Sequence, residues 1–139
     1  MTSLLDGPSP AVLTTYRRNG TAVSSPVWFR RSGEFLEVVI ADGDAKLGQL
    51  ARRPDCSLLV FEAVPPFRAV RIEGPAELVR DGVAAARHEI AGRYLGAAAG
   101  RRFTASRGPG AILRLPLAGA RTWDLSGILP PTPSPGRTG

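Results

Sequence analysis

The sequence predicts a small, mainly β protein, a barrel or roll of mostly antiparallel strands with a few short helices. Several runs of β-branched and aromatic residues show apolar alternation, and Gly, Pro or Asn turn signals separate them. Only two or three segments show helical spacing of their apolar residues. The length of 139 residues fits one domain with one core. Together these observations favour a β-barrel or roll over a layered α/β fold.

The first part of the chain predicts an antiparallel meander of strands over 10–16, 21–30 and 34–41. Asn19-Gly20 is the strongest hairpin signal in the sequence, between the first two strands. Pro26 has no amide hydrogen, so the second strand belongs at an edge or a bulge. Alternation places Phe29 on one face of that strand and Trp28 on the other.

The rest of the chain predicts two helices, a further short one, and three more strands. Asp44 is a good N-cap for a short helix that Pro54 closes. Gly74-Pro75 indicates a bend within one strand, and Ala118-Gly119 an interruption within another. The expected elements after the first helix are a strand over 56–63, a strand over 68–79, a helix over 81–95, a short helix within 96–106 and a strand over 110–125.

Composition and length exclude several classes of protein. No apolar run is long enough to span a bilayer, and no secretory signal is evident, so we expect no membrane partner. A single cysteine, Cys56, fits a reducing cytoplasm. We expect one folded domain over 1–126 and a disordered tail, rich in Pro, Ser and Gly, over 127–139. The net charge of +6 leaves a nucleic-acid binder as a third hypothesis, but the arginines are spread along the chain rather than clustered.

Side chains that could perform catalysis unaided are scarce. His88 is the one histidine and lies on the alanine-rich helix without a partner, as expected of an exposed helix residue. Cys56 opens a buried strand and is expected to behave as a small apolar residue. We therefore predict no catalytic side chain and no metal site, and expect a cofactor to supply the chemistry of any enzyme built on this chain.

Lys46 is the one lysine among 18 basic residues, and it lies in the first turn of the first predicted helix. A helix N-terminus offers unpaired amide hydrogens and a partial positive charge, so a lysine there can form a phosphate site. The carboxylates of Asp42 and Asp44 argue against this interpretation, and a solvated surface lysine is the alternative.

A family resemblance adds to this reading. The runs "VLTTYRRNGTAVSSPVWF", "KLGQLARRPDCSLLV", "RAVRIEGPAELV" and the closing "RTWDL" together resemble the split β-barrel flavin and deazaflavin oxidoreductases related to pyridoxamine 5′-phosphate oxidase. The likeness covers about Ala11 to Leu125 and is greatest for the small proteins that bind the deazaflavin coenzyme F420. It implies a split β-barrel of six or seven mostly antiparallel strands, and a homodimer with F420, or alternatively FMN, at the subunit interface.

The resemblance also implies which residues bind the cofactor. The strand "SPVWFR" would follow the ring system, the end of the next strand would approach the ribityl chain, and Lys46 would bind the phosphate. Arg68 lies close to a position that often touches the cofactor, and Trp123 would cover the site from the partner subunit. The residues implied are Ser25, Pro26, Val27, Trp28, Val39, Ile40, Lys46, Arg68 and Trp123.

Three departures from the family pattern qualify this prediction. Ile40 stands where a threonine is common, Ala45 where an arginine is common in the oxidases, and Gly48 where a basic residue is common. These changes argue against pyridoxamine phosphate oxidase activity itself. Two hypotheses remain: an oxidoreductase that transfers hydride to an unidentified small organic acceptor, and a non-catalytic protein that binds a cofactor or a tetrapyrrole on the same fold.

Overall fold

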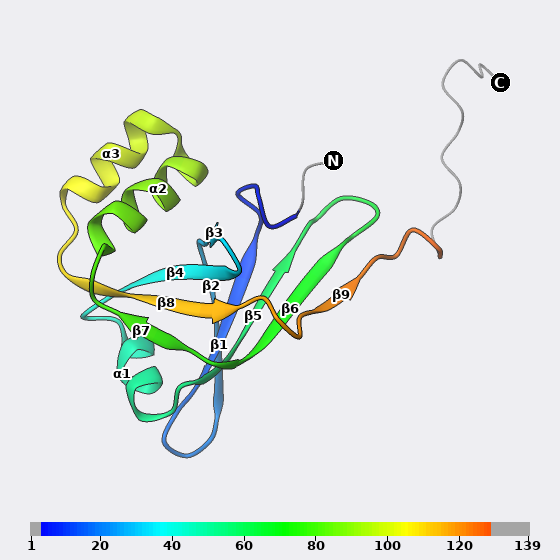
Figure 1. Cartoon of the computed structure of the whole chain (residues 1–139), viewed down its shortest axis with the longest axis horizontal. Coiled ribbons are helices and arrows are strands. Elements are labelled where there is room, and N and C mark those ends of the chain that lie inside the picture. Colours follow the sequence, from blue (N-terminus) through cyan, green and yellow to red (C-terminus); the bar gives the residue numbers. More distant parts are fainter. Residues whose placement is uncertain (1–3, 129–139) are drawn as a thin grey trace.

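The computed structural model describes residues 4–128, which form two antiparallel sheets and three helices (Figure 1). Of the tail expected over 127–139, residues 129–139 lie outside the described residues. Five strands form one sheet in the order β2-β1-β5-β6-β9, with bounds β2 Ala22–Val27, β1 Ala11–Tyr16, β5 Asp55–Phe61, β6 Ala69–Pro75 and β9 Arg121–Trp123. Four strands form the other in the order β3-β4-β8-β7, with bounds β3 Arg30–Ser32, β4 Phe35–Ala41, β8 Gly110–Pro116 and β7 Glu77–Val79. The helices are α1 Ala45–Arg52, α2 Val83–Leu95 and α3 Ala97–Ala105.

Three of the expected strands each change sheets, and this produces nine strands within the described residues rather than six or seven. The chain crosses from β6 to β7 just after Gly74-Pro75 and from β8 to β9 around Ala118-Gly119, so both predicted interruptions are confirmed. A mainly β architecture, with antiparallel pairing in every ladder, is confirmed as well.

The predicted single meander over 10–41 is wrong, because the strand expected over 21–30 ends at Val27. Two large aromatic residues, Trp28 and Phe29, lie where the chain passes from β2 in one sheet to β3 in the other. Phe29 is fully buried in the core, whereas Trp28 packs against α2 and α3. The β1–β2 hairpin and the β3–β4 hairpin therefore lie in different sheets.

The core lies between the two sheets. The β1–β5 ladder contributes Leu13 and Leu58, and the β4–β8 ladder contributes Leu36 and Leu113, all with no exposed surface. Burial of one leucine side chain is worth ~2 kcal/mol. Apolar residues of the two sheets thus meet in one core.

The helices are placed at the ends of the sheets. Helices α2 and α3 form a pair beside β4 and β8, and α1 lies at the opposite end of β4 from β3 (Figure 1). Gly100 allows α3 to approach α2 closely, because a Cβ there would lie 2.9 Å from the backbone of Gly92. None of the helices within residues 4–128 combines the length and apolarity that crossing a bilayer requires.

Candidate functional site

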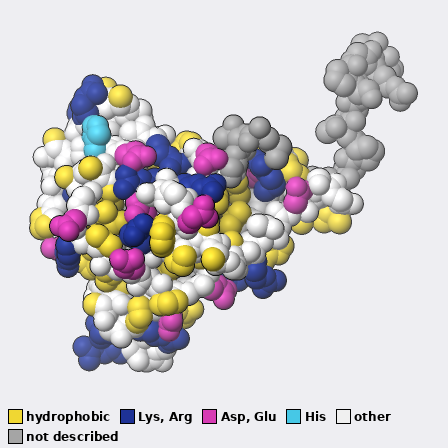
Figure 2. Space-filling view, viewed as in Figure 1, with side chains coloured by type: hydrophobic (Ala, Val, Ile, Leu, Met, Phe, Trp, Pro, Cys, Tyr) yellow, Lys and Arg dark blue, Asp and Glu magenta, His cyan; other side chains and the backbone are white. Residues whose placement is uncertain are grey.

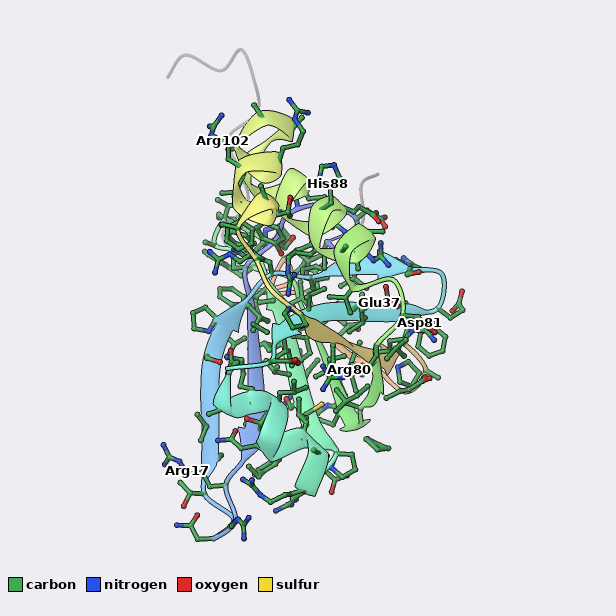
Figure 3. The ribbon with its side chains drawn as sticks, turned by 90° about the vertical axis from the view of Figure 1, so that its left-hand side faces the viewer. Arg17, Glu37, Arg80, Asp81, His88 and Arg102 are labelled. Atoms are coloured by element: carbon green, nitrogen blue, oxygen red, sulfur yellow. The ribbon has the colours of Figure 1, made fainter. Side chains whose placement is uncertain are left out.

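A cavity of about 230 Å³ opens where α1, α2 and α3 meet the ends of β2 and β4. It combines an aromatic wall, an apolar floor and several charged groups. Figure 3 views the molecule from the side of the helices. The lining residues are Pro26, Val27, Trp28, Val38, Val39, Ile40, Ala41, Asp44, Lys46, Arg87, Ile90, Phe103 and Arg107.

Aromatic side chains form one wall of this cavity. Trp28 stacks on Tyr94 of α2, with ring centroids 5.2 Å apart and an interplanar angle of 12°. Phe103 of α3 packs against the same indole at 5.2 Å with a tilt of 49°. The Tyr94 hydroxyl accepts a hydrogen bond from the Phe29 amide and donates one to the Ser9 carbonyl. These two bonds fix the position of the Tyr94 ring in the stack. This wall offers a flat apolar surface to a planar ligand.

Lys46 lies at the N-terminus of α1, where one carboxylate already binds it. Asp44 is the predicted N-cap: its Oδ1 accepts from the Lys46 amide at 2.9 Å. Its Oδ2 lies 2.8 Å from Lys46 Nζ. Burial opposes ionisation of Asp44, but the hydrogen bonds from Lys46 outweigh it and hold the pKa of that carboxyl below its ordinary value. The phosphate site predicted from the sequence therefore contains an internal anion.

Two arginines complete the charged part of the cavity. Arg87 is only 9% exposed, and its Nη1 donates to the Gly108 carbonyl at 2.6 Å. The Arg107 guanidinium lies 4.0 Å from the centroid of the Phe103 ring. Within residues 4–128 neither arginine forms an ion pair with a carboxylate. The cavity is cationic apart from Asp44.

The structure brings six of the nine predicted cofactor residues together at this cavity, namely Pro26, Val27, Trp28, Val39, Ile40 and Lys46. Ser25 does not line the cavity; it lies on the less exposed face of β2, and its Oγ is the one buried side-chain polar atom without a partner in the described part of the chain.

The other two predicted residues lie elsewhere. Arg68 forms a bidentate ion pair with Glu62 in the β5–β6 connection, at 2.8 and 3.1 Å. Trp123 lies in β9 and lines a shallow groove with Phe67 and Leu125. Trp123 belongs to the five-stranded sheet and Arg68 to a loop that joins two of its strands, and neither lines the cavity.

Sequence reasoning missed several lining residues, and for one of them a signal was present. Arg87 falls on the apolar stripe of α2, in register with Val83, Ala86, Ile90 and Tyr94 at the spacing of one helix face. A charged residue on such a stripe is unusual, and it is a signal of a functional or specially paired side chain. Phe103 and Arg107 reach the cavity only because α3 folds back on α2, which local patterns do not reveal.

The remaining candidates have the expected environments. His88 lies on the exposed face of α2 and projects away from the body of the molecule (Figure 3). Cys56 is buried, and desolvation together with the nearby charge of Asp55 raises the pKa of its thiol to about 12. Acidic and basic side chains alternate across the face seen in Figure 2, so that face is not an extended basic surface.

Comparison with known proteins identifies the family to which this chain is similar. A family model described as "Pyridoxamine 5'-phosphate oxidase" matches residues 1–124. The comparison with curated proteins gave no match.

Several solved structures share the fold. An F420 reductase is 22% identical, with a TM-score of 0.69 over 85% of this chain and 93% of that one. A conserved hypothetical protein from Mycobacterium tuberculosis is 21% identical, with a TM-score of 0.71 over 94% of this chain and 87% of that one. The heme storage protein HutZ from Vibrio cholerae is 18% identical, with a TM-score of 0.63 over 82% of this chain and 85% of that one. These likenesses confirm the split-barrel fold.

Proposed function

This chain belongs to the pyridoxamine 5′-phosphate oxidase family, and on that premise we propose that it is an oxidoreductase that binds F420, or alternatively FMN. The cofactor would lie at the interface of a homodimer, and hydride would pass between it and a small organic acceptor. The observation that carries the proposal is the position of Lys46, at a helix N-terminus and at the edge of a cavity with an aromatic wall.

The residues of the cavity fit a ring joined to a phosphate. Trp28 and Phe103 offer apolar surface to the ring, and Val39 and Ile40 line the route towards α1. Strand β2 is an edge of its sheet, so one side of its backbone has no strand partner within residues 4–128 and can meet the polar edge of a ring. The first turn of α1, with Lys46, offers amide hydrogens and a positive charge to a phosphate.

The bound cofactor would supply the hydride chemistry, and the protein would bind, orient and exclude water. For the phosphate to bind, Lys46 Nζ must exchange the Asp44 carboxylate for the ligand or be shared between them. Apart from arginines, the acid–base side chains that line the cavity are Asp44 and Lys46, and these two are paired with each other at 2.8 Å. This agrees with a reaction that needs no acid–base side chain of the protein.

Two observations support a dimeric site. The cavity of about 230 Å³ is smaller than the ~300–1,000 Å³ typical of small-molecule sites, so one chain supplies part of the enclosure. Phe67 and Leu125 are 39% and 37% exposed beside Trp123. A second subunit would bury this apolar surface. In the proposed dimer, Trp123 of the partner subunit is available to cover the cofactor.

The direct test is titration of the purified chain with F420 and, separately, with FMN, followed by quenching of tryptophan fluorescence. Micromolar or tighter binding of one of them supports the proposal, and turnover of the reduced cofactor with a panel of acceptors then tests catalysis. Sedimentation at several protein concentrations tests the dimer. Failure of both ligands to bind at 100 μM would refute the cofactor assignment.

The second candidate is a non-catalytic protein that binds a cofactor or a tetrapyrrole on the same fold. The ion pair between Lys46 and Asp44 favours it, because an internal anion weakens a phosphate site. Similar structures include the heme storage protein HutZ and an FAD and heme binding protein from Mycobacterium smegmatis. Hemin titration, together with an absence of turnover under conditions where F420 or FMN binds, would favour this alternative.

A further inference from the structure

A second cavity, of about 550 Å³, lies between α2, α3 and the segment that leads into β8. Three arginines line it, together with small residues of the two helices and the loop, and no aspartate or glutamate does. The arginines are Arg87, Arg101 and Arg107. Two of them, Arg87 and Arg107, also line the first cavity, so the two spaces adjoin.

Arg87 is the unusual residue of this group. It is nine-tenths buried, yet within residues 4–128 its side chain makes one hydrogen bond, which Nη1 donates to the Gly108 carbonyl. A guanidinium has five N–H donors, so most of its capacity is unused by the protein. These unpaired N–H groups keep some contact with solvent, since Ser25 Oγ is the one fully buried side-chain polar atom without a partner in residues 4–128. Other partly buried guanidinium groups, unlike that of Arg87, are paired with a carboxylate. Arg30 and Arg114 both form ion pairs with Glu37, at 2.8 and 2.7 Å.

The backbone around Arg87 leaves room for its charged group. A Cβ at Gly110 would lie 3.0 Å from Arg87 Nη2 and 2.4 Å from the Ile40 carbonyl oxygen. Only glycine fits between these groups without movement of the backbone. The guanidinium is thus held in place beside the start of β8, close to both cavities.

The other two arginines can act with Arg87. Arg107 stacks on Phe103, and stacking leaves the N–H edges of a guanidinium free to donate. Arg101 lies on the exposed side of α3, and like Arg107 it has no ion pair in the described chain. Planar guanidinium groups bind carboxylate and phosphate groups through paired hydrogen bonds.

We propose that this second cavity, hereafter the arginine cavity, binds the carboxylate or phosphate group of a small organic molecule. The anion has two possible sources, an acidic group of the cofactor or an acidic hydride acceptor. That choice rests on the proposed function, because both sources require a cofactor in the first cavity. Anion binding itself does not depend on it.

The test is isothermal titration of the full-length chain at low ionic strength, with citrate and pyrophosphate as probes. We expect saturable binding that Arg101→Gln and Arg107→Gln each weaken roughly fivefold, the scale of one ordinary net hydrogen bond, because solvent screens the charge at these exposed positions. Arg87→Lys keeps the charge but loses the paired geometry, so we expect about a tenfold loss. Arg102→Gln is the matched control: it removes the same charge from the next position of α3, and Arg102 projects away from the molecule (Figure 3).

Absence of binding of both probes at millimolar concentration would overturn the proposal. An equal loss with Arg102→Gln and Arg101→Gln would do so too, because it would reveal non-specific attraction. Circular dichroism of each variant checks folding, and the exposed Arg101 keeps the test valid if Arg87→Lys is destabilised.

Competition identifies the source of the anion. Displacement of citrate by F420, which carries carboxylates, but not by FMN, would assign the arginine cavity to the cofactor. Binding of citrate alongside F420 would assign it to an acidic acceptor. Cofactor binding without citrate or pyrophosphate binding would refute the arginine cavity alone, whereas binding of these anions without either cofactor would refute the proposed function alone.

Discussion

Replacement of Asp44 by asparagine is expected to strengthen the binding of a phosphate-bearing cofactor. The carboxylate occupies Lys46 Nζ at 2.8 Å, so an incoming phosphate must compete with it. Asparagine is as good an N-cap as aspartate, and its Oδ1 can still accept from the Lys46 amide. The substitution therefore removes the competing charge and keeps the start of α1.

The size of the gain follows from the exposure of the pair. Opposite charges about 4 Å apart interact by ~1 kcal/mol in water and ~4 kcal/mol near a protein surface. The side chain of Lys46 is 19% exposed and that of Asp44 35%, so solvent screens much of this energy. We expect a net gain of roughly 1–2 kcal/mol, which is a five- to thirtyfold tighter cofactor complex.

The assay is fluorescence titration of the wild type and the Asp44→Asn variant with F420 and with FMN, since Trp28 lines the cavity. Asp42→Asn is the matched control. It makes the same change two residues away, where the carboxylate pairs with Arg80 and does not line the cavity. Unchanged or weaker binding by Asp44→Asn, or an equal gain with Asp42→Asn, would refute the argument that Asp44 competes for Lys46.

Three further predictions concern the framework of the site. Gly100→Ala should lower the free energy of unfolding by ~1–3 kcal/mol in urea titrations, because its Cβ would lie 2.9 Å from the Gly92 backbone. Gly92→Ala, whose Cβ meets nothing within 4 Å, is its control, and equal stability of both variants would contradict the prediction. Tyr94→Phe removes a hydroxyl that makes two hydrogen bonds, so we expect a loss of ~1–3 kcal/mol in the same assay, and no loss would contradict this role. The Cys56 thiol has a pKa of about 12, so it is protonated at pH 8 and should resist iodoacetamide until the chain unfolds. Rapid alkylation of the native protein, followed by mass spectrometry, would show otherwise.

Local patterns in the sequence predict the elements of this fold but not how the strands divide between sheets. Asn19-Gly20 and the cap at Asp44 act within a few residues, so both are visible in the sequence. The crossing at Trp28 and Phe29 depends on what each ring packs against, and Tyr94 lies far along the chain. A sheet change without a glycine or proline at the crossing leaves no local signal.

The candidate site shows the same division. Lys46 could be singled out because a helix N-terminus is a local feature, and Arg87 because it interrupts an apolar stripe. Phe103 and Arg107 could not, since their place in the cavity depends on the close contact of α3 with α2 at Gly100. The role of Trp123 stays a prediction about a dimer, which one chain cannot complete, and the cofactor contact of Arg68 stays a prediction as well.

The central claim is that Lys46 recognises the phosphate of a cofactor bound in the first cavity. The most direct test compares each cofactor with its phosphate-free form, F420 with its deazaflavin nucleoside and FMN with riboflavin, on the wild type and on Lys46→Ala. For whichever cofactor binds, we predict that the wild type prefers the phosphorylated form at least about tenfold, the scale of a charge-assisted hydrogen bond, and that Lys46→Ala abolishes the preference. An equal preference in both proteins would contradict the account and leave Lys46 as a surface lysine paired with its own helix cap.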